Sequence, residues 1–353
     1  MCLRLKCFLA RVGLRRQTKT YMDIREVAKR AGVSTATVSR TINNLPVRPG
    51  TARRVRQAIE ELKYYPNTQA RSLVSGRSRI VGLIVSDITN PFFPELVKGF
   101  EEAATEKGYE VLLSNTGYDS SRMANGVRRM LERKVDAVAI MTSEMDASLT
   151  QQLARRKIPM VFLDVGTVDN HISNVKIDYS SGISQAVEHL LELGHRRIAF
   201  ISGPADLTSA RIRSAAFLDA MRKRGVIGDP SWIEAGNHRI DGGFHAMSRI
   251  FERRPLPTAV LSSNDLTAIG ALRAIRQHGL HVPDDISVVG FDDIALAEFT
   301  EPPLTTVRLP RQEIAGKAFD ALLTSLADTT RMGVEYMISP QLVVRESTAK
   351  ARE

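Results

Sequence analysis

Short, unbroken apolar runs recur along the chain after Ile80, and they constrain its fold more than any other feature. Runs of four to six apolar residues without polar alternation are typical of strands buried on both faces of a parallel sheet. The runs are Ile80–Val85, Val111–Ser114, Ala137–Met141, Met160–Leu163, Ile198–Ser202, Ala259–Ser262 and Ser287–Phe291. Helical patterns separate them, at Glu95–Lys107, Ile183–Leu193 and Leu266–His278 among others. This alternation predicts doubly wound α/β structure, and roughly ten or more strands favour two similar lobes over one sheet.

A different pattern precedes these runs. Between Ile24 and Asn43 the apolar residues have helical spacing, and Gly32 interrupts them as a helix stop. Ser34 follows as an N-cap for a second short helix. Two short helices joined by a glycine-containing turn predict a helix-turn-helix. A third helix is expected from about Pro49 to Pro66.

The net charge of +10 is unevenly distributed along the chain. Residues 1–21 contribute +6 and residues 22–79 contribute +8, whereas residues 80–353 contribute −4. A basic head on a mildly acidic body is typical of a polyanion-binding module joined to a domain with another task. The charge distribution alone is equally consistent with a basic surface that contacts only solvent.

The first 21 residues are predicted to be a disordered extension or to precede the true start at Met22, alternatives that the intact mass of the native protein distinguishes. Basic residues interrupt their apolar stretch too often for a secretory signal. The only cysteines, Cys2 and Cys7, lie in this extension, so no disulfide framework is expected and a reducing cytoplasm is the simplest compartment. No run approaches the ~18 apolar residues of a membrane helix, so no membrane partner is expected.

Side chains at the start of the second helix are candidates for reading DNA, because an α-helix fits the major groove. Thr35, Ala36 and Arg40 are the candidates for base contacts, with Arg40 able to bind guanine through two hydrogen bonds. The candidates for phosphate contacts are Ser34, Ser39, Thr41 and Asn43.

With these residues in place, the chain resembles the lac repressor (LacI/GalR) family. Residues 24–43 (IREVAKRAGVSTATVSRTIN) resemble the family's DNA-binding head, and LKYYPNTQARSL resembles its hinge segment. Further similarity lies in SDITNPFF (86–93), VFLDVGT (161–167), LGHRRIAFISGP (193–204), SARIRSAAF (209–217), SSNDLTAIGAL (262–272), VVGFDDI (288–294), PPLTTV (302–307) and LVVREST (342–348). The resemblance covers essentially everything from Met22 onward.

The resemblance implies a domain order and a minor-groove contact. It implies a helix-turn-helix domain over 22–66, a hinge helix and linker over 67–79, and a two-lobed periplasmic-binding-protein-like effector and dimerisation domain over 80–353. Leu73 matches the family's wedge leucine, with Ala70 and Arg71 beside it in the groove. Arg48 departs from the family, since a small capping residue is usual there, which leaves the third helix with a weaker cap.

A small-molecule site is expected between the lobes, because ligands of open α/β sheets bind outside the carboxyl ends of strands. Asp87, Asp164, Asn264 and Asp292 each follow or end a predicted strand, and their oxygens and amide suit the hydroxyls of a sugar. Arg213 matches the family's effector-binding arginine, and Phe92 and Phe93 are candidates for an apolar wall. Two alternatives stay open: Asp292 and Arg213 as a structural ion pair, and Asp87 as a helix cap. Asp265 and Asp293 are expected to be structural.

An enzyme is not expected. The sequence has no Walker loop, GxGxxG, HExxH or G-x-S-x-G motif. Adjacent strand residues point to opposite faces, so Asp292 and Asp293 cannot act as an acid/base pair in one cleft. His189 and His195 are not spaced like metal ligands, and neither a cofactor nor a metal is expected. A sugar-processing enzyme and a transport-type sugar receptor are the rival classes.

The sequence therefore predicts a cytoplasmic transcription regulator, more often a repressor in this family. A homodimer would bind palindromic double-stranded operator DNA under the control of a small effector, a sugar or sugar derivative. The effector's identity, its role as inducer or corepressor, and the operator are not readable from the sequence.

Overall fold

The structure is a computed structural model, and it describes residues 23–43, 45–65, 76–142, 145–164, 166–226, 232–328 and 330–352. The chain forms two units, residues 1–76 and 77–353. This boundary falls inside the segment expected to be hinge and linker. No helix in the described ranges is long and apolar enough to cross a bilayer.

The first unit is the expected three-helix head, with α1 (Ile24–Ala31), α2 (Thr35–Ile42) and α3 (Pro49–Leu62). Gly32 adopts φ 65° and ends α1, and the Ser34 hydroxyl caps α2 by accepting from the Thr37 amide at 3.2 Å. Fully buried Val27, Val38 and Val55 pack the three helices together.

The predicted end of the third helix is wrong. The helix ends at Leu62, because Lys63 turns into the left-handed region with φ 47° and its amide bonds back to the Glu60 carbonyl. Pro66, where the end was expected, lies outside the described residues. A lysine in the conformation that usually selects glycine gives no signal in the sequence.

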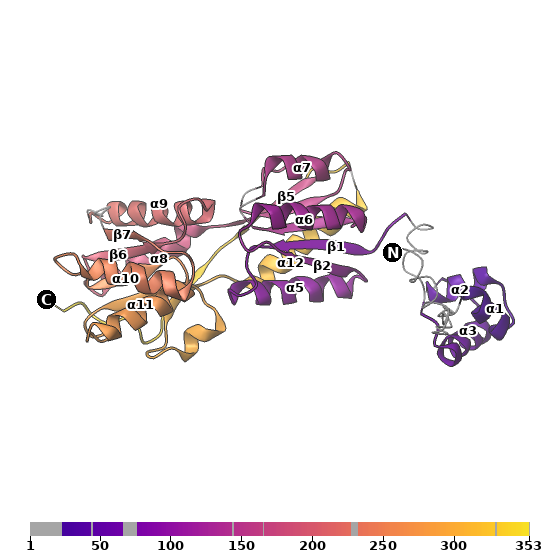
Figure 1. Ribbon diagram of the computed structural model, residues 1–353, viewed down its shortest axis with the longest axis horizontal. Helices are drawn as coiled ribbons and strands as arrows, with labels where there is room; N and C mark the ends of the chain where they lie inside the picture. Colours follow the sequence, from indigo (N-terminus) through magenta and orange to yellow (C-terminus); the bar gives the residue numbers. More distant parts are fainter. Residues whose placement is uncertain are drawn as a thin grey trace, which may run out of the picture. The chain divides into compact units, whose positions relative to one another are not determined.

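The second unit holds two six-stranded sheets, one in each of two lobes (Figure 1). The first lobe has the order β11-β5-β4-β3-β1-β2 with every pair parallel. Its strands are β1 (Ile80–Val85), β2 (Glu110–Asn115), β3 (Ala137–Met141), β4 (Met160–Leu163), β5 (Ile172–Ile177) and β11 (Glu335–Ile338).

The second lobe repeats this plan with the order β12-β10-β9-β8-β6-β7, where only β12 runs antiparallel to its neighbour. Its strands are β6 (Ile198–Ser202), β7 (Ile233–Ala235), β8 (Ala259–Ser262), β9 (Ser287–Asp292), β10 (Thr305–Arg308) and β12 (Gln341–Val343). All seven predicted runs are strands, within one residue at each end.

Helices cover both faces of each sheet. In the first lobe, Leu83 of β1 packs toward α5 (Phe92–Glu106) and α12 (Arg311–Ala327), whereas the next residue, Ile84, packs toward α6 (Ser120–Glu132) and α7 (Ala147–Ala154). The second lobe is covered by α8 (Tyr179–Glu192), α9 (Thr208–Lys223), α10 (Ile240–Phe251) and α11 (Asp265–Gln277), with a 3-10 turn η2 (Ala295–Phe299) after β9.

The chain passes between the lobes three times, after β5, after β10 and after β11 (Figure 1). The second crossing brings α12 and β11 into the first lobe, and the third takes the chain back to β12 in the second lobe. These crossings allow the two sheets to face each other across one cleft.

The α10–α11 contact supplies a test of the packing. A Cβ on Gly270 of α11 would overlap the Ile240 carbonyl oxygen and the Phe244 amide nitrogen, whereas a Cβ on Gly316 of α12 would meet no atom within 4 Å. We expect Gly270→Ala to lower the free energy of unfolding by about 1–3 kcal/mol or more. We expect Gly316→Ala to raise it by about 0.5–1 kcal/mol, since alanine favours the helix. Urea denaturation measures both, and equal stability of the two variants would contradict this packing.

Candidate functional sites

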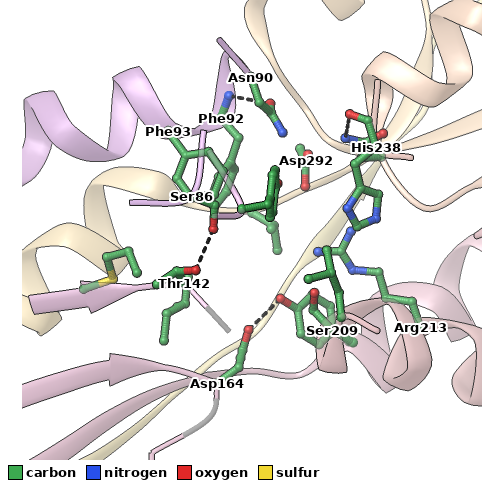
Figure 2. Close-up of a pocket in the computed structure, with 17 residues that line it drawn as sticks. Ser86, Asn90, Phe92, Phe93, Thr142, Asp164, Ser209, Arg213, His238 and Asp292 are labelled. Atoms are coloured by element: carbon green, nitrogen blue, oxygen red, sulfur yellow. Dashed lines mark hydrogen bonds between the residues drawn. The ribbon is translucent and has the colours of Figure 1, made fainter. Parts of the chain in front are cut away.

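A cavity of about 80 Å³ lies in the second unit, at the carboxyl ends of strands from both sheets (Figure 2). Ser86 and Thr142 follow β1 and β3, Asp164 follows β4, and Asn264 and Asp292 follow or end second-lobe strands. Six of the seven predicted effector residues line it, which are Phe92, Phe93, Asp164, Arg213, Asn264 and Asp292. Three of the four residues predicted from strand ends, Asp164, Asn264 and Asp292, are thus among them.

Arg213 of α9 carries the positive charge of the cavity, with only 7% of the residue exposed. Its guanidinium carbon lies 4.6 Å from the Tyr179 ring centre and 4.8 Å from that of Phe291. One nitrogen, Nη1, donates to the Ser263 carbonyl, whereas Nε is buried and has no hydrogen-bond partner in the described structure. Burial disfavours the charge, but Tyr179 and Asp292 nearby hold the pKa of Arg213 above its usual value.

Asp164 is held from two sides. Its Oδ1 accepts from the Ile177 amide at 2.8 Å, and its Oδ2 accepts from the Tyr179 hydroxyl at 2.6 Å. Burial raises the pKa of Asp164 even though these donors and Arg213 oppose the shift. The carboxylate is therefore fixed in position before any ligand arrives.

Asp292 ends β9 with only 4% exposure and a φ of 111°, which an L residue rarely adopts. Burial raises its pKa to about 7, against the opposing charges of Arg213 and Arg311. No ion pair within 4.0 Å joins Asp292 to Arg213 in the described chain, so the contacts do not support a structural ion pair between them. Asp293 instead pairs with Arg308 at 2.6 Å and Arg345 at 2.8 Å, in the structural role expected for it.

Asn264 has two contacts within the protein. Its side-chain oxygen caps α11 by accepting from the Thr267 amide, and its amide nitrogen donates to the His238 carbonyl at 3.1 Å. Phe92 and Phe93 form an edge-to-face pair with ring centres 5.2 Å apart, and both belong to the core as well as to the cavity wall. These residues therefore shape the cavity as well as face it.

Asp87 is the predicted effector residue that does not line the cavity. Its carboxylate accepts from the Thr89 amide and hydroxyl and pairs with Arg239, which precedes α10, at 3.1 Å. It does not cap α5 directly, since Asn90 accepts from the Phe92 amide there. Asp87 thus forms an ion pair between the lobes.

His238 and Tyr179 line the cavity but were not predicted from the sequence. His238 is 8% exposed, its Nε2 has no partner in the described structure, and Figure 2 shows its ring beside Arg213. Burial, and then the charge of Arg213, lower the pKa of His238 to about 3, so the ring is neutral at physiological pH. Tyr179 follows β5 and His238 follows β7, two strands that the apolar runs did not predict, so strand-end reasoning passed over both residues.

The candidate DNA interface is the exposed face of α2. Ser34, Thr35, Ala36, Arg40 and Asn43 are exposed and Ser39 is half-buried. The prediction for Thr41 is wrong: it is buried, and its hydroxyl donates to the Thr37 carbonyl at 2.9 Å. Ala70, Arg71 and Leu73 lie outside the described residues.

A helix-turn-helix head and a two-lobed ligand-binding unit on one chain define a class of ligand-responsive DNA-binding proteins. Comparison with known families agrees, since residues 23–67 match the bacterial regulatory proteins of the lacI family and residues 187–348 match the periplasmic binding protein-like domain. The chain belongs to the LacI family.

Two relatives and one solved structure match nearly the whole chain. The HTH-type transcriptional repressor PurR of Vibrio vulnificus (strain CMCP6) is 34% identical, over 93% of this chain and 98% of its own length. The ribose operon repressor of Escherichia coli (strain K12) is 35% identical, over 92% and 99%. The crystal structure of the lac repressor dimer bound to operator and the anti-inducer ONPF has a TM-score of 0.82 at 28% identity, over 93% and 99%.

The raised pKa of Asp292 predicts a pH effect on stability. Its pKa is about 7 in the folded protein and 3.8 in the unfolded chain, so the folded protein binds this proton more tightly. The resulting stabilisation is fully present below pH 3.8 and is lost as the pH rises toward 7. Asp292→Asn keeps a neutral group at all pH values. We expect the wild type to lose up to about 4 kcal/mol more than this variant between about pH 4 and pH 8, measured by urea denaturation. An identical pH profile for the two proteins would contradict the buried, neutral carboxyl.

Proposed function

We propose that this chain is a sequence-specific DNA-binding transcriptional repressor whose operator affinity is controlled by a small, sugar-like effector in the cavity. The observation that supports this proposal most is that one chain combines an exposed recognition face on α2 with a cavity that both polar and aromatic side chains line. The buried Arg213 Nε and His238 Nε2 in that cavity lack partners within the described structure. Buried polar atoms without partners cost stability, and a hydroxyl-rich ligand would satisfy them.

The DNA contact follows from the exposure of α2. Arg40 is exposed and its side chain forms no ion pair in the described head, so its guanidinium is available to a guanine edge. Ser34 places the amino end of α2 for a phosphate. The lac repressor in the similar solved structure is a dimer bound to operator. A homodimer of this chain would likewise present two such helices to a palindromic site.

Effector control follows from the position of the cavity between two lobes. A ligand in contact with Asp164 of the first lobe and Arg213 of the second would favour the closed arrangement of the lobes. The hinge segment expected over 67–79 would carry this change to the head, with a coupling of about 1–3 kcal/mol. One relative is named for the ribose operon, which supports a sugar as effector.

The proposed role is binding without turnover, in the cytoplasm, where operator DNA lies. The relatives are named as repressors rather than enzymes. Asp293 is engaged by two arginines and does not line the cavity, so it does not form an acid/base pair with Asp292 there.

Arg40 provides a test of base reading. We expect Arg40→Gln to lose about 1–3 kcal/mol of discrimination at one base pair in each half-site, because a bidentate guanine contact is removed. The measurement compares dissociation constants for an operator selected from random duplexes with those for its single-base variants. Arg53→Gln, which removes an exposed cation of α3, is the control and should weaken all sequences alike. Unchanged base preference in Arg40→Gln would contradict the proposed role of Arg40.

Arg213 provides a test of effector binding. A thermal-shift screen of pentoses, hexoses and purines should find a ligand that stabilises the wild type by about 2.7 kcal/mol at 100-fold its dissociation constant. We expect Arg213→Met to abolish this shift, because the cavity loses its charged donor. Asp87→Asn, which lies outside the cavity, should retain it. Far-UV circular dichroism checks the folding of both variants, and a full shift in folded Arg213→Met would exclude this cavity as the site.

A further inference from the structure

The end of the first lobe that adjoins the linker carries an excess of positive charge. All six strands of this lobe are parallel, so their amino ends and the carboxyl ends of the preceding helices meet on one side, where β1 begins (Figure 1). We name this surface the linker face. It consists of segments 77–79, 107–109, 133–136, 155–159, 169–171 and 331–334, each leading into a strand.

The linker face carries nine exposed cations and two carboxylates. The cations are Arg77, Arg79, Lys107, Arg133, Lys134, Arg155, Arg156, Lys157 and Arg331, and the carboxylates are Asp136 and Asp169. Asp136 is already occupied by the Ser78 amide and hydroxyl and the Arg79 amide. Four acids adjoin the face, Glu106, Glu110, Glu132 and Asp328, and an excess of cations persists when they are included. Residues 80–353 as a whole have an acidic excess, so this face is locally distinct.

Five of these cations are unpaired in the described structure. Arg133 and Lys134 follow α6, and Arg155, Arg156 and Lys157 follow α7, a helix that packs against α6. None of their side chains forms a hydrogen bond or ion pair there. Lys134 and Lys157 adopt φ values of 52° and 55°, which favour glycine. Lysine therefore occupies both turns although glycine would fit their backbone better.

Helix dipoles alone do not account for this charge. Cations favour the carboxyl ends of helices in any such lobe, and the second lobe repeats the same architecture. Its corresponding described segments 195–197, 224–226, 252–258, 279–286 and 300–304 carry five Arg and four acids. These arginines are engaged: Arg253 pairs with Glu234 and Arg224 with Glu188, and Arg196, Arg197 and Arg254 donate to backbone carbonyls. The cation excess belongs to the lobe that the linker joins.

We propose that the linker face binds the phosphodiester backbone of duplex DNA flanking the operator. This inference rests on the proposed function, because the head must first hold the DNA. Residues 66–76 connect Arg77 to the head and span at most roughly 40 Å, so bound DNA stays within reach of the face. Unpaired Lys and Arg side chains bind phosphates without reading bases, so the contact adds affinity and salt dependence but no sequence preference.

The test uses the full-length chain and two duplexes. One is the shortest operator selected by the wild type from random palindromic DNA, and the other is the same operator extended by about ten base pairs, one helical turn, at each end. We expect the wild type to bind the extended duplex more tightly and with a steeper salt dependence. In R155Q/R156Q/K157Q we expect the affinity for the extended duplex to fall about tenfold at low salt, and the slope of log K against log[salt] to fall by about 0.9 for each lost contact. Affinity for the short duplex should be unchanged.

The control is R222Q/K223Q/K350Q, which removes the same charge from exposed positions of the second lobe. It should bind both duplexes like the wild type. Equal losses of affinity in the two variants would overturn the proposal. So would a linker-face variant that keeps the wild-type preference for the extended duplex and the wild-type salt dependence. The second result is also expected if the linker face binds an acidic protein instead of DNA. If the wild type selects no operator, the proposed function fails instead. Equal melting temperatures show that the variants are folded.

Discussion

The parallel direction of the strands within each lobe is the constraint on which the rest of this molecule depends. It sends the carboxyl end of nearly every strand toward one side of its sheet and the amino end toward the other. Because the two lobes face each other with their carboxyl ends, polar residues that follow strands meet in one cavity. The opposite side of the first lobe collects helix carboxyl ends, and there the basic residues gather.

The cavity combines one buried cation with carboxyl groups whose pKa values burial raises. Arg213 lies against two aromatic rings, and Asp164 is held by Tyr179 and a backbone amide. Such a site is already ordered, so a ligand need not organise it on binding. Two buried nitrogen atoms, Arg213 Nε and His238 Nε2, have no hydrogen-bond partner in the described structure. They favour a ligand that can accept and donate hydrogen bonds.

Much of this arrangement was predictable from the sequence, and what was not depended on tertiary contacts. Apolar runs predicted seven strands, because burial on both faces leaves no polar position, but β5, β7 and β10 to β12 are not among those runs. Strand ends then predicted Asp164, Asn264 and Asp292. The end of α3 was not predictable, because Lys63 adopts a conformation that its sequence does not favour. His238 and Asp87 depended on which lobe lies opposite them, and local patterns do not contain that information.

The interleaving of the lobes has a consequence for biosynthesis. The first lobe needs α12 and β11, which are encoded near the carboxyl terminus, to complete its sheet and cover one face. A nascent chain emerging from the ribosome therefore exposes an unfinished sheet edge at β5 until α12 and β11 have been made. Because β12 likewise completes the second sheet, neither lobe can complete its sheet before this late part of the chain has been made.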